Sequence, residues 1–381
     1  MMIKMRKNAG AVIIILAGVL VLAMVLPGLF QGNGSTTTNN KYWDAVVATA
    51  NGRKITRLEY EREYISQLQL RSQLGGVRYD QLDKLRSSVL DMVIDKELIL
   101  AQAAKEKINL SKEVIDAEYK KQKESVSAGI AENWASFLNN WAFTEATFRT
   151  YVAENTLYDT YTSLKAEYAA VTDAEITAEF NRRKASNASL VLEDVQEEIK
   201  STLEYERRRT AINNLLSKLR KQAEEDGEVE IKDARILGYR AYETAEYDSS
   251  IDYYKAALKE SEQDPYLWCS LAMAQARKGV YEDAMVSIGK AMDLGEDFTI
   301  YLTRAEINAM QKLDDAAYTD FESAIKLAGT NLGVLQTINF VIEELKEDGY
   351  DTARINERFM QAVTEALKAQ ETSATDGTTA P

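Results

Sequence analysis

The chain contains no histidine, and this absence removes several kinds of active site at once. Ser-His-Asp triads, Cys-His dyads and histidine-ligated metal sites all require an imidazole. Cysteine is nearly absent as well, because Cys269 is the only one in 381 residues. An intramolecular disulfide is therefore excluded, and Cys269 is expected to be a small apolar residue on a helix.

Proline is also scarce, since only Pro27, Pro265 and Pro381 occur. Because proline interrupts helices, the proline-free run of residues 28–264 predicts long continuous helices. The hydrophobic content of 45% and the charged content of 28% are typical of globular proteins. A chain of 381 residues is long enough for two or three domains. We therefore expect a mainly α-helical protein of several parts.

A basic surface is missing too, because the net charge is −14. Proteins that bind nucleic acid neutralise phosphates with clustered lysine and arginine. The densest basic group is residues 207–209, and Glu204 and Glu206 lie beside it. Such mixed charge is typical of a solvated helix face. Nucleic acid is therefore excluded as a partner.

One long apolar segment is present, at residues 9–30. As a helix it spans about 33 Å, enough for a hydrocarbon core of about 30 Å. Lys4, Arg6 and Lys7 precede it, which predicts a cytoplasmic amino terminus of residues 1–8 and the bulk of the chain across the membrane. A cleaved signal peptide is the alternative, but its apolar region is usually shorter. Residues 31–42 then predict a flexible polar linker.

The first folded segment begins with VVATANGRKITRLEYEREY at residues 46–64. Asn51-Gly52 is a favoured hairpin turn between two short strands. Thr56 and Glu59 form a capping box that begins a helix. The next helix runs from Asp80 to about residue 107 with a broad apolar face, and Asp83 is a favourable charge in its first turn.

Further helices are predicted by capping residues at Ser111, Thr144 and Thr172. The densest aromatic group of the chain lies among them: Trp134, Phe137, Trp141, Phe143 and Phe148. These side chains have two interpretations at this point. They can form an ordinary core, or they can line a surface that accepts apolar segments of other proteins.

Residues 46–231 resemble the chaperone core of the SurA and PpiD family of bacterial envelope folding factors. The resemblance lies in the entry strand and helix, the KINLS step at residues 107–111 and the VTDAEI segment at residues 171–176. Residues 195–225 resemble the returning helix of that core, and residues 229–231 resemble its closing strand. In enzymatically complete relatives a parvulin prolyl isomerase domain is inserted before the returning helix. Here residues 180–190 (FNRRKASNASL) are expected to be a short polar link, which implies a core of residues 43–231 with the insertion absent near 181–192.

The segment 232–368 carries an internal repeat. Equivalent alanines, Ala257, Ala291 and Ala324, lie 34 and 33 residues apart, close to the period of tetratricopeptide repeats. This spacing predicts a solenoid of paired helices with a carboxy-terminal cap, followed by a disordered tail at residues 369–381. First helices line the concave face of such a solenoid, and ordinary packing between repeats is the alternative role for its residues. The candidates for this face are Tyr239, Tyr242, Met273, Arg277, Glu306 and Met310.

The resemblance implies a membrane-anchored extracytoplasmic chaperone, without catalysis, that holds newly exported unfolded chains. It also implies the bacterial cytoplasmic membrane as the location and the Sec translocon or envelope proteins as partners of the repeats. An envelope interaction scaffold is the alternative. A prolyl isomerase or a hydrolase is disfavoured, because no carboxylate belongs to a motif that defines a site. We expect no catalytic residue, no cofactor and no metal.

Overall fold

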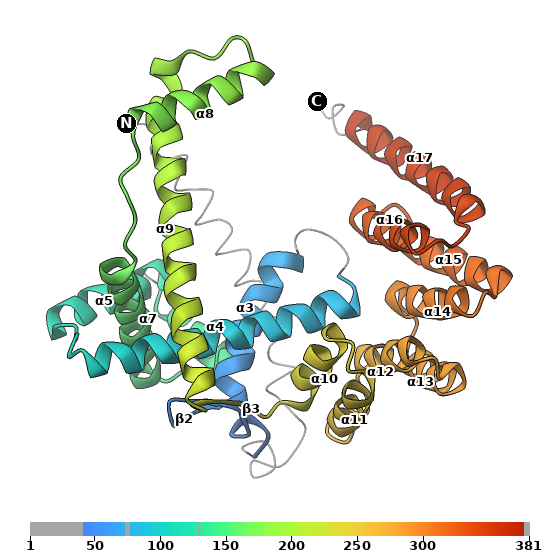
Figure 1. The fold of residues 1–381 in the computed structure, drawn as a ribbon, viewed down its shortest axis with the longest axis horizontal. Helices are drawn as coiled ribbons and strands as arrows, with labels where there is room; N and C mark the ends of the chain where they lie inside the picture. Colours follow the sequence, from blue (N-terminus) through green and yellow to red (C-terminus); the bar gives the residue numbers. More distant parts are fainter. Residues whose placement is uncertain (1–40, 73–76, 129, 377–381) are drawn as a thin grey trace. The chain divides into compact units, whose positions relative to one another are not determined.

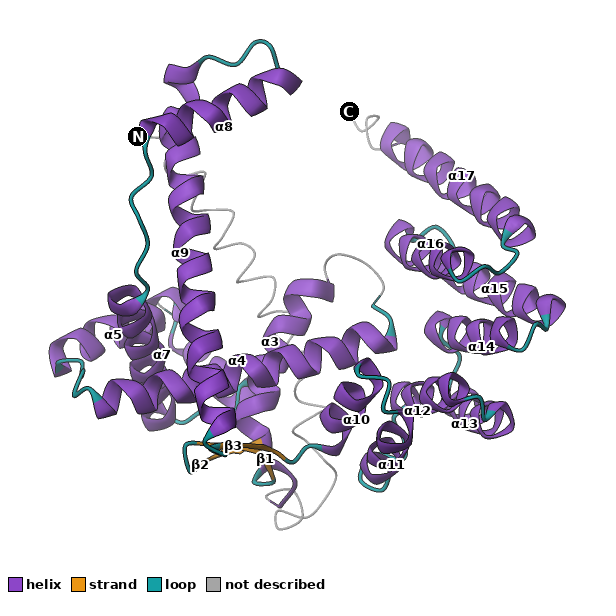
Figure 2. Ribbon diagram, in the orientation of Figure 1, coloured by secondary structure: helices purple, strands orange, loops and turns teal. Residues whose placement is uncertain are grey.

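The computed structural model describes residues 41–72, 77–128 and 130–376. Helices dominate these residues, and Figure 2 shows the one small sheet among them. The expected membrane anchor at residues 9–30 and most of the expected linker lie outside the described residues. Within the described part of the chain, no helix combines the length and the apolar character needed to cross a bilayer.

Three short strands form an antiparallel sheet in the order β2-β1-β3: β1 Val46–Ala50, β2 Arg53–Thr56 and β3 Val229–Ile231. Asn51 and Gly52 connect β1 to β2 with φ angles of 50° and 77°, the left-handed pair that a tight hairpin turn requires. The backbone N–H of Asn51 donates to the carbonyl of Glu228 at 2.9 Å. The predicted hairpin and its closing strand are confirmed.

Helix α3 (Arg57–Ser72) begins at the predicted capping box. The backbone N–H of Thr56 donates to Glu59 at 2.8 Å, and the N–H of Glu59 donates to the Thr56 hydroxyl at 3.3 Å. Helix α4 (Tyr79–Lys105) follows and carries the broad buried face expected of a central helix. Its buried apolar residues are Leu85, Val89, Leu90, Val93, Ile94, Leu98, Ile99 and Ala103.

The described residues divide into two compact units that interleave along the chain. Among the described residues, the first unit contains 41–44, 48–55 and 92–230, and the second contains 45–47, 56–91 and 231 onward. Helix α4 therefore contributes residues 79–91 to the second unit and residues 92–105 to the first. One boundary between the units falls at residues 230 and 231, and the second unit also includes residues 45–47 and 56–91.

The first unit also contains α5 (Lys112–Ser127), α6 (Ala131–Asn140), α7 (Glu145–Lys165), α8 (Asp173–Ser186) and α9 (Leu192–Glu225). Ser111, Thr144 and Thr172 cap α5, α7 and α8 as predicted. Three leucines of α9 pack against Ile99, Ala103 and Tyr161: Leu215, Leu216 and Leu219. These contacts join α4, α7 and α9 in one helical core.

Helix α8 lies at one end of α9 (Figure 1). The expectation of a polar link over residues 180–190 is wrong for its first half, because α8 continues to Ser186. Phe180 is 7% exposed and packs with Ile176 and Ile199. The physical reason is that Ile176 and Phe180 lie four residues apart, so both occupy the buried face of the same helix. The connection between α8 and α9 is residues 187–191.

The second unit continues with helices that pack in consecutive pairs: α10 (Ala234–Glu243) with α11 (Tyr247–Leu258), α12 (Pro265–Lys278) with α13 (Tyr281–Leu294), α14 (Phe298–Met310) with α15 (Asp314–Ala328), and α16 (Leu332–Glu347) with α17 (Ala353–Asp376). Ala291 and Ala324 are completely buried, and Ala257 is partly buried. The small residues of the sequence repeat therefore lie where helices approach closely.

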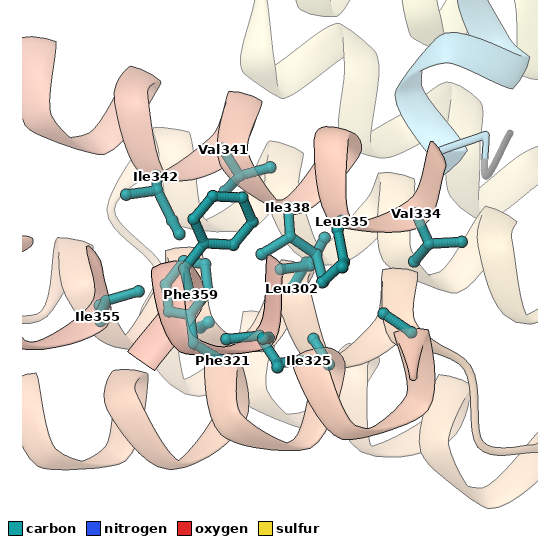
Figure 3. Packing of buried hydrophobic residues seen from close by; sticks show 14 of the residues in the cluster. Leu302, Phe321, Ile325, Val334, Leu335, Ile338, Val341, Ile342, Ile355 and Phe359 are labelled. Atoms are coloured by element: carbon teal, nitrogen blue, oxygen red, sulfur yellow. The ribbon is translucent and has the colours of Figure 1, made fainter. Parts of the chain in front are cut away.

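The last two pairs share an apolar core, shown in Figure 3. Leu302 from α14, Phe321 from α15, Ile338 from α16 and Phe359 from α17 meet there. Helix α17 runs to Asp376, beyond residue 368 where the repeat region was expected to end.

Candidate functional site

The predicted aromatic group lies in a small bundle formed by α5, α6 and α7. Trp134 and Phe148 are 6% and 2% exposed, and their rings meet edge to face with centroids 5.2 Å apart. Phe137 stacks on Trp134 at 5.5 Å, and Phe143 meets Phe148 at 5.4 Å. The structure therefore brings these four predicted residues together.

The members of this group differ in their exposure. Trp134 and Phe148 form the buried centre, whereas Phe137, Trp141 and Phe143 are only partly buried. Trp141 lies 6.4 Å from Phe137, so it extends the group rather than standing apart. The bundle thus has a buried aromatic centre with three partly buried rings beside it.

Charged side chains surround the aromatic group. The indole N–H of Trp134 donates to Glu145 at 2.7 Å, and Lys123 forms an ion pair with the same carboxylate at 2.9 Å. The Lys123 ammonium also lies 4.9 Å from the Trp134 ring centroid. On the other side, the Arg149 guanidinium lies over the ring of Tyr119 at 5.5 Å. Cations over aromatic faces hold these rings in fixed orientations.

Two exposed tyrosines near the segment that follows α7 were not identified from the sequence. Residues 166–172 have no regular secondary structure, and Arg207 of α9 donates to the carbonyls of Ala169 and Ala170 at 3.0 and 2.7 Å. Arg208 and Arg209 are exposed, as expected of a solvated helix face, and Arg207 also holds this segment. Near this anchor, Tyr168 and Tyr205 are 47% and 65% exposed.

The candidates for the concave face of the repeat lie in the second unit. Five of them, Tyr239, Tyr242, Met273, Arg277 and Glu306, line one cavity of about 340 Å³. Met310 packs against the neighbouring apolar cluster around Cys269. Phe340 and Glu344 of α16 line the same cavity. The cavity therefore shows that α10, α12, α14 and α16 share one face, which we call the inner face.

Residues 78–91 of the same unit lie against the inner face. Asp83 is 1% exposed; it accepts from Arg235 of α10 at 2.6 Å and from the hydroxyl of Ser270 of α12 at 2.6 Å. Arg240 donates to Ser87 at 3.1 Å and to Asp91 at 2.5 Å. Asp83 was expected to be a favourable charge in the first turn of its helix. No local signal distinguishes it from such a charge, because its partners lie far along the chain.

The amino end of this segment contacts the later helices of the array. Arg78 donates to Glu306 of α14 at 3.0 Å and lies 3.7 Å from Glu344 of α16. It also pairs with Asp80 at 2.7 Å. Tyr79 is 4% exposed and packs in the cluster that contains Met273. Segment 78–91 therefore crosses the inner face in the direction opposite to the order of the helix pairs.

The carboxylates around Arg78 outnumber the nearby cations. Burial raises the pKa of Glu306 to about 7; Asp80 and Glu344 reinforce this, whereas Arg78 and Arg277 oppose it. Desolvation outweighs the attraction to Arg78, because three carboxylates share that one guanidinium. Glu306 is therefore a buried acid that titrates near neutral pH.

We predict that the second unit loses stability as the pH rises from about 4.5 to about 7. The pKa of Glu306 is raised from 4.5 to about 7 in the folded chain, so the folded state binds this proton more tightly than the unfolded state. The stability that such a group contributes is fully present at pH values below its ordinary pKa. It is lost as the pH rises toward the raised pKa of the folded state. Replacing Glu306 by glutamine removes this loss, and Arg78 keeps Asp80 and Glu344 as partners. Denaturation midpoints at pH 5, 6, 7 and 8 test this; equal pH dependence of both proteins contradicts it.

Cys269 and the acidic side chains are the remaining groups that could bind a metal ion or react as nucleophiles. Burial raises the pKa of the Cys269 thiol, which keeps it protonated and unreactive. No group of three or more cysteine, aspartate or glutamate side chains in the described part of the chain is arranged to hold a metal ion.

Part of the chain is similar to a known protein family. No curated protein matches the chain. A family model described as the SurA-like N-terminal domain matches residues 1–162. The described part of this match includes β1, β2, α3 to α6 and most of α7, and so contains the aromatic group and segment 78–91. Residues 1–162 are therefore similar to the SurA-like N-terminal domain, which supports a SurA-type chaperone core in this part of the chain.

Proposed function

We propose that the protein is a membrane-anchored extracytoplasmic chaperone that holds unfolded exported proteins and does not catalyse prolyl isomerisation. The observation that carries this proposal is the match of residues 1–162 to the SurA-like N-terminal domain, which suggests a chaperone-type function in general. Residues 9–30 would anchor the chain in the bacterial cytoplasmic membrane, with the bulk on the extracytoplasmic side.

The aromatic group of α5 to α7 is the proposed client-binding surface. A holdase must bind many different sequences. Aromatic side chains suit this role because they bury a large apolar area against many kinds of partner. Trp134 and Phe148 fix the bundle from inside, and Phe137, Trp141 and Phe143 remain partly exposed beside them. Lys123 and Arg149 lie over the rings of Trp134 and Tyr119 in the same bundle.

The helix pairs of the second unit are proposed to be tetratricopeptide repeats. The alanine spacing of 34 and 33 residues and the pairing of α10 to α17 support this assignment. In the proposed function this unit recruits the Sec translocon or an envelope protein, or extends the client-binding surface.

We predict that residues 41–381 slow the aggregation of a chemically unfolded model protein at near-stoichiometric ratios. Replacing both Trp141 and Phe143 by alanine should weaken client binding by about 1–2 kcal/mol, because partly exposed aromatics contribute less than fully buried ones. Light scattering during refolding measures the effect. Tyr253→Ala is the control, since Tyr253 is 38% exposed on α11 and belongs to the other unit.

The outcomes separate the proposals. Suppression that the double variant loses and the Tyr253 variant keeps supports client binding by the bundle. Unchanged suppression in the double variant places the client site elsewhere. No suppression by the wild type contradicts the holdase. Isomerase activity on a proline peptide, abolished by a point mutation, would contradict the absence of catalysis.

An interaction scaffold is the second candidate, and exposed apolar side chains on the helix pairs favour it. Val286, Phe340 and Met360 are 66%, 58% and 59% exposed. A scaffold retains one partner with a defined affinity, whereas a holdase binds unrelated unfolded proteins. A pull-down with the full chain, followed by a titration of any retained protein, distinguishes the two.

A further inference from the structure

We propose that the inner face of the helix pairs is a helix-binding surface whose resident ligand is residues 78–91 of the same chain, so that an external partner reaches this face only by displacing them. This inference goes beyond the proposed function and does not depend on it. All of the contacts that carry it lie within the second unit.

The first argument is the pattern of the ligand. Asp83, Ser87 and Asp91 lie four residues apart, so they form one stripe along α4. Each of them bonds to a first helix of a pair: Asp83 to Arg235 and Ser270, and both Ser87 and Asp91 to Arg240. A single polar stripe that meets successive helices is how a helix lies in a groove.

The second argument is the chemistry of the contact. Its centre is polar and buried, since Asp83 is 1% exposed and also receives a 3.4 Å hydrogen bond from Tyr254. One apolar anchor, Tyr79, fills a position beside Met273. Buried charge pairs of this kind specify a partner and its register more than they add affinity. A competing ligand should therefore be a helix with carboxylates at four-residue intervals and a tyrosine four residues before the first of them.

The third argument is that the described residues of the ligand leave a cavity beside them. The cavity has a volume of about 340 Å³, and Phe340 on its wall is 58% exposed. Arg78, which also lines the cavity, contacts Glu306 and Glu344. A longer competitor can first contact this cavity and then replace residues 78–91 stepwise.

The test uses the full chain and a fluorescent peptide with the sequence of residues 77–92. In the wild type the covalently connected ligand has an effective concentration near millimolar, so the peptide competes poorly. Asp83→Asn and, separately, Asp91→Lys should weaken the resident ligand and make the peptide bind about ten-fold more tightly than to the wild type. A control peptide with lysine in place of both aspartates should not gain affinity. Fluorescence anisotropy measures the binding.

Hydrogen exchange on the same proteins completes the test. Amides of residues 79–91 should exchange faster in both variants, while those of residues 92–105 keep the wild-type rate. The proposal is overturned if neither variant gains affinity, if the control peptide binds equally well, or if exchange over residues 79–91 does not change. The Asp91 variant keeps the test decisive if the Asp83 variant fails to fold, because the Asp91–Arg240 pair is 30% and 35% exposed and its loss is tolerable.

Discussion

Replacing Asp83 by alanine is expected to lower the free energy of unfolding of the second unit by about 3–5 kcal/mol, because it leaves buried polar partners without an acceptor. Asp83 is 1% exposed and bonds to Arg235 and Ser270 at 2.6 Å each. Arg235 retains Asp264 at 2.5 Å, but its side chain is 11% exposed and cannot turn to water. Denaturant unfolding followed by circular dichroism measures the change.

The matched control is Asp91→Ala, on the same stripe of the same helix. The Asp91–Arg240 pair is short, at 2.5 Å, but its side chains are 30% and 35% exposed. Partly solvated pairs contribute about 1 kcal/mol or less. Equal losses for the two variants would show that Asp83 is not a buried centre of the contact and would contradict this prediction.

Replacing Gly238 by alanine is expected to destabilise the second unit, and this is the second large effect that we predict. Gly238 lies in α10, and an added Cβ would approach Cδ1 of Tyr254 to 2.8 Å and Cε1 to 2.9 Å. The Tyr254 ring is 2% exposed and is held by the hydrogen bond to Asp83, so it has no free direction in which to move. Overpacking of this kind costs about 1–3 kcal/mol. The thermal midpoint of unfolding should fall.

Gly289→Ala should instead raise the thermal midpoint of unfolding. Gly289 lies inside α13, and no atom lies within 4 Å of the Cβ that alanine would add. Alanine is favoured over glycine in a helix interior by about 1 kcal/mol. The two variants make the same chemical change in helices of the same unit. A fall in the midpoint for both, or a rise for both, would show that contact with Tyr254 does not decide the outcome.

The sequence predicted the features that depend on neighbouring residues. The Asn51-Gly52 turn and the capping boxes at Thr56 and Thr172 are local, because each is decided by residues one to three positions apart. The buried alanines at residues 291 and 324 follow from a period that repeats along the chain. Such patterns can be recognised in the sequence without knowledge of the tertiary structure.

The inner-face contact was not predictable in the same way. Arg78 and Glu306 lie 228 residues apart, and nothing near either residue marks the other. Arg207 is a similar case, since only the path of residues 166–172 gives it the carbonyls of Ala169 and Ala170. For the aromatic group, composition identified the members, but only packing separates the buried Trp134 from the partly exposed Phe143.

The interleaving of the two units has a consequence for biosynthesis. A ribosome releases the chain amino end first, and Arg235 follows Asp83 by 152 residues. At synthesis rates of about 5–20 residues per second, the stripe of α4 waits roughly 8–30 s for its partners. The complete first unit is made in that interval, since its last residues are at 230. The unit that contains residues 79–91 of α4 is therefore completed last, although this part of α4 is made before most of the first unit. A ribosome stalled before residue 231 would display Tyr79 and Asp83 to the surroundings.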